Sequence, residues 1–129
     1  MGNNIILVVV NDVFFYTKLR DALKRHGYQL EKARTQTEVA DKARALHPAA
    51  IILNLNDEKL DAFVALDALK SDDQLRAIPI LAFVNHDDVD HWKRAQQLGV
   101  TKVVSRNEFS ASALELVRAV MATQGTSTT

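Results

Sequence analysis

The sequence predicts a single α/β domain with a doubly wound parallel sheet, in which five strands alternate with five helices. Three observations favour this architecture. Short apolar runs recur along the chain, the clearest being Ile5–Val10 and Ala50–Asn54. Segments with apolar residues at helical spacing lie between these runs. The length of 129 residues suits one domain with one hydrophobic core.

The predicted strands are short apolar runs bounded by turn residues. The run 5–10 is rich in valine and isoleucine and is expected at the centre of the sheet, whereas 28–33 is more polar and is expected at an edge. Pro79 stands at the start of the fourth run, where its missing amide does least harm. The predicted strands span residues 5–10, 28–33, 50–54, 78–84 and 100–105.

The predicted helices carry apolar residues three to four positions apart, with charged residues between them. Gly27 and Gly99 are expected to close the first and fourth helices, because glycine favours the position that follows a helix. Pro48 stops the second helix, since the residue before a proline disfavours helical backbone. The residues expected to cap the amino ends of the second, third and last helices are Thr35 or Thr37, Asp61 and Ser110.

The bulk composition excludes several classes of function. Sixteen Lys and Arg balance sixteen Asp and Glu, so no electrostatic argument supports binding to nucleic acid or to an anionic membrane. The absence of cysteine excludes disulfides and zinc–thiolate sites and fits a reducing compartment, so we expect a cytoplasmic protein. No apolar run approaches the roughly 20 residues that cross a bilayer, and the run 5–10 is too short for a signal peptide.

The end of the chain differs in composition from the rest. Residues 123–129 are rich in glycine, serine and threonine. We therefore expect a domain over residues 1–122, followed by a flexible tail over residues 123–129.

Several segments stand in the order typical of one bacterial signalling family. Asn11-Asp12 closes the first strand, RHGYQLEKA ends the first helix, LHPAAIILNLN contains the buried strand, and LRAIPILAFV and AQQLGVTKVVSR lead into the last two strands. From Ile5 to Ala122 the chain resembles the CheY-like receiver domain of response regulators. The resemblance implies a flavodoxin-like fold with strand order 2-1-3-4-5, and a role in two-component signalling or a phosphorelay.

The resemblance also implies a phosphorylation site, from which this sequence departs. In receivers, an aspartate after the third strand accepts the phosphoryl group, and two acids after the first strand help to bind Mg²⁺. Here the acceptor position is Asn54, and the first acid is Asn11, so that only Asp12 keeps its carboxylate. Asn56 stands where a backbone carbonyl would bind the metal. We expect Mg²⁺ binding to be weak or absent, and no other cofactor.

The positions that relay phosphorylation in receivers are changed as well. Val84 stands at the hydroxyl position, Val103 at the aromatic position and Arg106 at the lysine position. An uncharged carboxamide is a very poor nucleophile, so an acyl phosphate should not form at Asn54. We also expect Asp12 and Arg106 to form a charge-assisted pair in place of a metal.

These departures predict a pseudo-receiver, a receiver fold without phosphotransfer. Such a domain would catalyse nothing and would bind protein partners independently of phosphorylation. The alternative is a receiver that is still phosphorylated, or that responds to a small ligand through the residual pocket.

Two surfaces are candidates for partner binding. Trp92 belongs to the helix that ends at Leu98, and it is either an interaction hot spot or a half-buried packing residue. Four bulky residues in a row, Val13 to Tyr16, cannot all point inward on one helix. One or two of them, Phe14 and Tyr16, are therefore expected to be exposed or to be covered by the last helix or another chain. A homodimer would form through the face of the fourth helix, last strand and last helix, or through the first and last helices.

The start of the fourth helix carries a cluster of histidine and aspartate residues. His86 and His91 flank Asp87, Asp88 and Asp90. A metal site is one interpretation of this cluster. We favour a solvated acidic first turn that complements the helix dipole.

Overall fold

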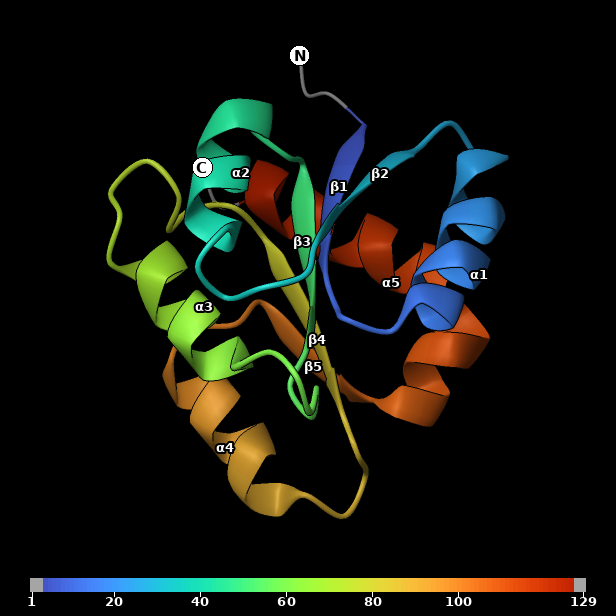
Figure 1. Cartoon of the computed structure of the whole chain (residues 1–129). Helices are drawn as coiled ribbons and strands as arrows, with labels where there is room; N and C mark the ends of the chain where they lie inside the picture. The colour runs from blue at the N-terminus through green and yellow to red at the C-terminus, as the bar shows by residue number, and fades with distance from the viewer. Residues whose placement is uncertain (1–3, 127–129) are drawn as a thin grey trace.

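The computed structural model, which describes residues 4–126, contains one parallel sheet of five strands with helices on both faces (Figure 1). The elements in chain order are β1 (Ile5–Val9), α1 (Val13–Lys24), β2 (Gln29–Ala33), α2 (Val39–Leu46), β3 (Ala50–Asn54), α3 (Ala62–Lys70), β4 (Ile80–Val84), α4 (Val89–Gln97), β5 (Lys102–Ser105) and α5 (Arg106–Thr126). The strand order is β2-β1-β3-β4-β5. The predicted flavodoxin-like topology is therefore confirmed.

The central strands send alternate side chains into two hydrophobic cores. Leu7 and Ile51 belong to the core that β1 and β3 share with α2, α3 and α4. Ile6 and Ile52 belong to the core shared with α1 and α5 on the opposite face. This alternation follows from the two-residue period of a strand. Because both faces are covered, the two strands have continuous apolar sequences, and polar residues appear only where the strands end.

Several of the predicted helix ends are confirmed. The Asp61 carboxylate accepts hydrogen bonds from the backbone amides of Phe63 and Val64, at 3.1 and 3.2 Å, and so caps α3. Gly27 and Gly99 have φ angles of +90° and +86°, a backbone conformation that glycine adopts without steric cost. Both residues turn the chain from a helix toward the next strand.

The predicted cap of α2 is wrong. The residue before the first turn is Glu38, and its side chain makes no capping hydrogen bond. Thr35 and Thr37 lie too early in the chain, because a turn over residues 36–38 precedes the helix. The Thr35 hydroxyl instead donates to the Glu38 carboxylate at 3.1 Å.

The predicted cap of the last helix, Ser110, is also wrong. α5 follows β5 without an intervening loop, and the Ser105 Oγ accepts a hydrogen bond from the backbone amide of Glu108 at 3.1 Å. Ser110 therefore lies inside the helix. The helical backbone is interrupted at Ser112, where φ is −137° and ψ is 32°.

The end of the chain is helical further than the sequence predicted. The backbone of α5 continues to Thr126, which includes residues 123–126 of the expected tail. Residues 127–129 of that tail lie outside the described part of the chain. Among the described residues, no helix has the length and apolar character needed to span a membrane.

The assignment of Ser105 as the cap of α5 predicts a contrast between two serine substitutions. Ser105→Ala should lower the free energy of unfolding by about 1 kcal/mol, because the Glu108 amide loses its acceptor. Ser110→Ala should change it by less than about 0.5 kcal/mol, since Ser110 is exposed within the helix. Urea denaturation of the two variants measures both values. An equal loss in both would contradict the assignment.

Candidate functional site

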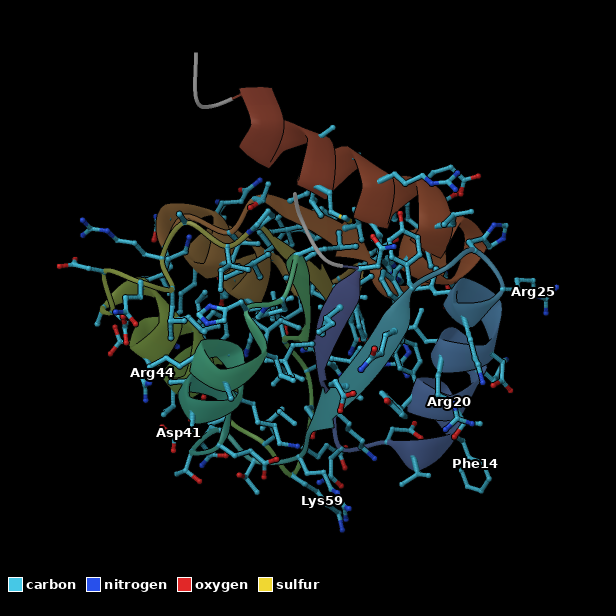
Figure 2. The ribbon with its side chains drawn as sticks, turned by 90° about the horizontal axis from the view of Figure 1, so that it is seen from above. Phe14, Arg20, Arg25, Asp41, Arg44 and Lys59 are labelled. Atoms are coloured by element: carbon cyan, nitrogen blue, oxygen red, sulfur yellow. The ribbon has the colours of Figure 1, made fainter. Side chains whose placement is uncertain are left out.

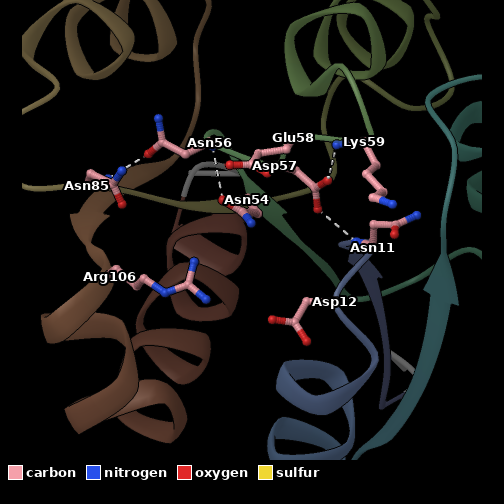
Figure 3. A pocket seen from close by; sticks show the side chains of 9 residues that line it. All are labelled: Asn11, Asp12, Asn54, Asn56, Asp57, Glu58, Lys59, Asn85 and Arg106. Atoms are coloured by element: carbon pink, nitrogen blue, oxygen red, sulfur yellow. Dashed lines mark hydrogen bonds between the residues drawn. The ribbon is translucent and has the colours of Figure 1, made fainter.

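A polar pocket of about 450 Å³ lies where the carboxyl ends of β1, β3 and β4 meet (Figure 3). In a parallel sheet these ends open toward the same edge, where ligands usually bind. The pocket contains every residue that the sequence singled out as an acceptor, acid or lysine position. The residues that line it are Asn11, Asp12, Asn54, Asn56, Asp57, Glu58, Lys59, Asn85 and Arg106.

Asn54, at the acceptor position, is the last residue of β3 and is only 7% exposed. Its Oδ1 atom accepts a hydrogen bond from the backbone amide of Asn56 at 3.0 Å, which fixes the start of the loop (Figure 3). The side chain thus turns the chain at the end of the strand. An amide oxygen used in this way gives the site no anionic nucleophile.

The end of β1 is held by two carboxylates, each bonded to a backbone amide. Asp12 Oδ1 accepts from the amide of Phe15 at 3.1 Å and caps α1. Asp57 Oδ2 accepts from the amide of Asn11 at 2.8 Å, which ties the loop after β3 to the end of β1. The sequence reasoning did not single out Asp57. Its position three residues after a buried strand end was the available signal.

The predicted pair between Asp12 and Arg106 is wrong. Within residues 4–126 these two side chains form no ion pair, although both face the pocket (Figure 3). The Arg106 guanidinium lies over the rings of Phe15 and Phe83, at 5.2 and 5.5 Å from their centroids. A planar guanidinium is suited to such a contact, and the Asp12 carboxylate is already engaged by α1.

The rings beneath Arg106 form an aromatic group in which one pair is stacked. Phe83 stacks on Phe109 with centroids 4.8 Å apart and an interplanar angle of 21°. Phe15 lies 5.0 Å from Phe83 and 5.8 Å from Phe109. Arg106 thus lies between an apolar floor and the polar pocket.

Asn56 joins the loop after β3 to the loop after β4. Its Nδ2 donates to Asp88 Oδ2 at 2.8 Å, and its Oδ1 accepts from the backbone amide of Asn85 at 2.6 Å. The sequence reasoning considered only the backbone carbonyl of Asn56. The side chain instead bonds Asn85, 29 positions further along the chain, and Asp88, 32 positions further along.

Asp88 is the acceptor at the centre of this bridge. Besides Asn56, its carboxylate accepts the backbone amide of His91 at 3.1 Å and lies 2.8 Å from His91 Nδ1. These hydrogen bonds, foremost that from the His91 amide, hold the pKa of the Asp88 carboxyl below its ordinary value. The His91 ring in turn packs against Phe63, with centroids 5.2 Å apart.

The two predicted switch positions on the strands have no polar role. Val84 ends β4 and is fully buried in the core with α2, α3 and α4. Val103 is half-buried against the same core. Neither side chain offers a hydroxyl or a ring to the pocket.

Few oxygen donors for a divalent cation remain at the acid positions of the pocket. Asp12 is the single carboxylate at the three acid positions, and it is bonded to an α1 amide. Asp57 and Glu58 add carboxylates to the pocket wall. Even so, residues 4–126 contain no group of three or more histidine, aspartate or glutamate side chains placed to hold a metal. The same finding covers His86, His91 and the acids between them.

The candidate interaction residues have different environments. Phe14 is 84% exposed and points away from the first turn of α1 (Figure 2), as predicted. Tyr16 is half-buried, and its hydroxyl donates to the Leu30 carbonyl of β2 at 3.0 Å, whereas the prediction named the last helix or another chain as the element that would cover it. Val13 is exposed instead. Trp92 is half-buried and packs against the core beneath α4.

Comparisons with known proteins point to one family. The polar-differentiation response regulators DivK of Brucella ovis and Brucella abortus are each 28% identical to the chain over 101 residues, which covers 78% of this chain and 82% of DivK. The chain is therefore similar in sequence to response regulators over most of its length. No protein-family model matches the chain.

Solved receiver structures share the fold at lower sequence identity. Chemotaxis protein CheY4 of Vibrio cholerae is 19% identical and aligns with a TM-score of 0.81, over 92% of this chain and 99% of CheY4. The receiver domain of a histidine kinase from Syntrophus aciditrophicus is 21% identical, with a TM-score of 0.74 over 91% of this chain and 92% of that domain. These likenesses show the shared fold.

The hydrogen bonds of Asp88 predict a specific pH dependence of stability. Because its pKa is lower in the folded state than in the unfolded chain, the carboxylate stabilises the fold fully above the ordinary aspartate pKa, and this contribution is lost as the pH falls through the folded pKa. Asp88→Asn should therefore lose less stability than the wild type between about pH 7 and about pH 3. Denaturant titrations at several pH values measure the difference. The control is Asp87→Asn at pH 7, which should change the free energy of unfolding by less than about 0.5 kcal/mol because Asp87 is exposed.

The environments of Trp92 and Phe14 predict opposite effects of truncation. Trp92→Ala should destabilise the domain by about 1–3 kcal/mol, because it removes apolar contacts with the core. Phe14→Ala should change stability by less than about 0.5 kcal/mol, since the ring is exposed. Chemical denaturation measures both. A destabilised Phe14→Ala variant would show that this ring is covered.

Proposed function

We propose that the domain is a pseudo-receiver: a phosphorylation-independent module for protein interaction and regulation in two-component-type signalling. The observation that carries the proposal is the state of Asn54. At the position where receivers carry the acceptor aspartate, the buried amide oxygen of Asn54 accepts a hydrogen bond from the Asn56 backbone amide. Phosphoryl transfer needs an anionic oxygen at this point, and Asn54 supplies none.

The arrangement of the surrounding loops supports the same proposal. The Asn56 side chain connects the loops after β3 and β4, and Asp57 connects the first of these to β1. The loops are thus joined by hydrogen bonds within the chain. A site satisfied by its own side chains has less to gain from binding a phosphoryl group.

The route by which a phosphoryl group would change the structure is altered as well. Val84 has no hydroxyl that could bond a phosphoryl oxygen, and Val103 has no aromatic ring that could change its orientation. The Arg106 guanidinium lies over the rings of Phe15 and Phe83. A ligand shifts an equilibrium only through its differential contacts with two states. These three residues remove the contacts on which such a shift would depend.

The proposal extends to partners, cofactors and place of action. We expect a cytoplasmic, non-catalytic domain that needs no cofactor and binds proteins rather than nucleic acid or membranes. The balanced charge of the whole chain supports this choice of partner. The exposed Phe14, on the edge that carries the pocket, is the candidate anchor for a partner.

The decisive experiment is incubation with acetyl phosphate and Mg²⁺, followed by intact mass measurement. The expected result is no phosphoryl adduct, under conditions in which a receiver with an intact acceptor aspartate is fully modified. A stoichiometric adduct on the wild-type chain would overturn the proposal.

The same experiment separates the alternative, a pocket that responds to a small ligand. Arg106 and Lys59 both line the pocket and give it two cations, which favours an anionic group there. Acetyl phosphate that raises the melting temperature without a mass adduct would support this alternative, provided that Arg106→Gln abolishes the shift.

A further inference from the structure

A groove runs between α1 and α5, on the opposite side of the sheet from α2, α3 and α4. It consists of two adjoining cavities of about 190 and 290 Å³. Ala22, Ser110 and Ala113 line both, so the cavities form one continuous depression. Figures 1 and 2 show the two helices side by side along this face.

The groove exists because both helices present small side chains to it. Ala22 on α1 faces Ser110, Ala111 and Ala113 on α5, and none of these side chains fills the space between the helices. The interruption of α5 at Ser112 falls within the same stretch. Small residues let another backbone approach closely, so the groove can accept a further helix packed against the two.

The floor of the groove is apolar. Phe15, Leu19 and Phe109 line its first part, and Leu23 and Leu114 its second. These side chains also belong to, or pack against, the core between the sheet and the two helices. An occupant would therefore extend an existing core rather than build a new one.

The rim of the groove is predominantly basic. Lys18 lines the first part and Arg25 the second, and neither forms an ion pair with any residue in 4–126. Glu115 is the one acidic side chain among the lining residues. Lys18 lies on α1 and Arg25 directly follows its last residue, so the two are seven positions apart, about two helical turns and about 10 Å along the helix axis.

We infer that this groove binds an acidic amphipathic helix of a protein partner. The apolar face of that helix would lie on the floor, with apolar residues at positions i, i+3 or i+4, and i+7. Its flank would carry two acidic residues about seven positions apart, which matches the spacing of Lys18 and Arg25. The inference rests on the proposed function as a protein-binding module and names the surface and the chemistry of the partner.

The test uses the full chain and a designed peptide of about 15 residues, a length at which an isolated helix begins to hold. The peptide carries leucines at the stated positions and two glutamates seven residues apart, and a matched peptide carries lysines in place of the glutamates. Amide chemical shifts of the ¹⁵N-labelled domain map the site, and fluorescence anisotropy gives the affinity. No phosphodonor is present.

Three variants locate the site. Ala22→Trp fills the groove from an exposed position. Lys18→Glu with Arg25→Glu reverses the charge of the rim. Lys24→Glu is the control, because Lys24 is exposed on α1 but does not line the groove. Circular dichroism and melting temperature verify that each variant is folded.

The expected result is shifts at groove residues with the acidic peptide only. Affinity should fall about tenfold or more in Ala22→Trp and about tenfold in the double charge reversal, against less than about twofold in Lys24→Glu. Unchanged affinity in Ala22→Trp, or no shifts at groove residues, would overturn the inference. Binding of the wild type to anionic phospholipid vesicles that the same variants abolish would also overturn it, in favour of a membrane surface.

Failure of this test and failure of the proposed function are distinguishable. A phosphoryl adduct would refute the pseudo-receiver whether or not the peptide binds. If the chain forms no phosphoryl adduct and the acidic peptide does not bind the groove, only the inference about the groove is refuted.

Discussion

Burial of β3 on both faces is the constraint on which the rest of the domain depends. All five of its residues are buried, and it lies between β1 and β4 at the centre of the sheet. The strand cannot move without opening both cores, so its last residue, Asn54, occupies a fixed point. The backbone groups that leave the sheet beside it need hydrogen-bond partners, and the loops around the pocket are arranged to supply them.

At this fixed point, hydrogen bonds to backbone amides engage the polar side chains. Receivers gather acids around a metal, and the gathered charges repel one another until a cation or phosphoryl group compensates them. Here Asn54 and Asn11 are neutral, and the carboxylates of Asp12 and Asp57 are each bonded to a backbone amide. The pocket thus has one carboxylate at the three acid positions, and both Asp12 and Asp57 are engaged by backbone amides.

The sequence predicted what depends on pattern and order. The apolar runs with their two-residue alternation placed the strands, and the order of the motifs gave the topology and brought Asp12, Asn54 and Arg106 to one pocket. The pairing of side chains within that pocket was not predictable, because side chains and backbone amides compete for the same carboxylates. The sequence allowed a pair between Asp12 and Arg106, but the backbone amide of Phe15, three residues after Asp12, is a nearer partner for the carboxylate.

Contacts between loops and the junctions of elements were missed for related reasons. The bridge from Asn56 to Asp88 joins residues 32 positions apart and depends on the course of two loops that carry no periodicity. Ser110 matched the usual position of a cap after a loop, but α5 begins with no loop at all, which gives the role to Ser105. The environment of Tyr16 was predicted from helix geometry alone, which does not show that its hydroxyl reaches the Leu30 carbonyl of β2.

The bridge made by Asn56 has a consequence for how such a domain can carry information. A switch reports through the ratio of two conformations, and a modification alters that ratio at constant protein level. In the proposed pseudo-receiver, the bridge would hold the loops in one arrangement and leave no such ratio to adjust. Its output would then follow from the number of copies in the cell relative to the dissociation constant of its partner, so that synthesis and degradation of the chain would be the controlling steps.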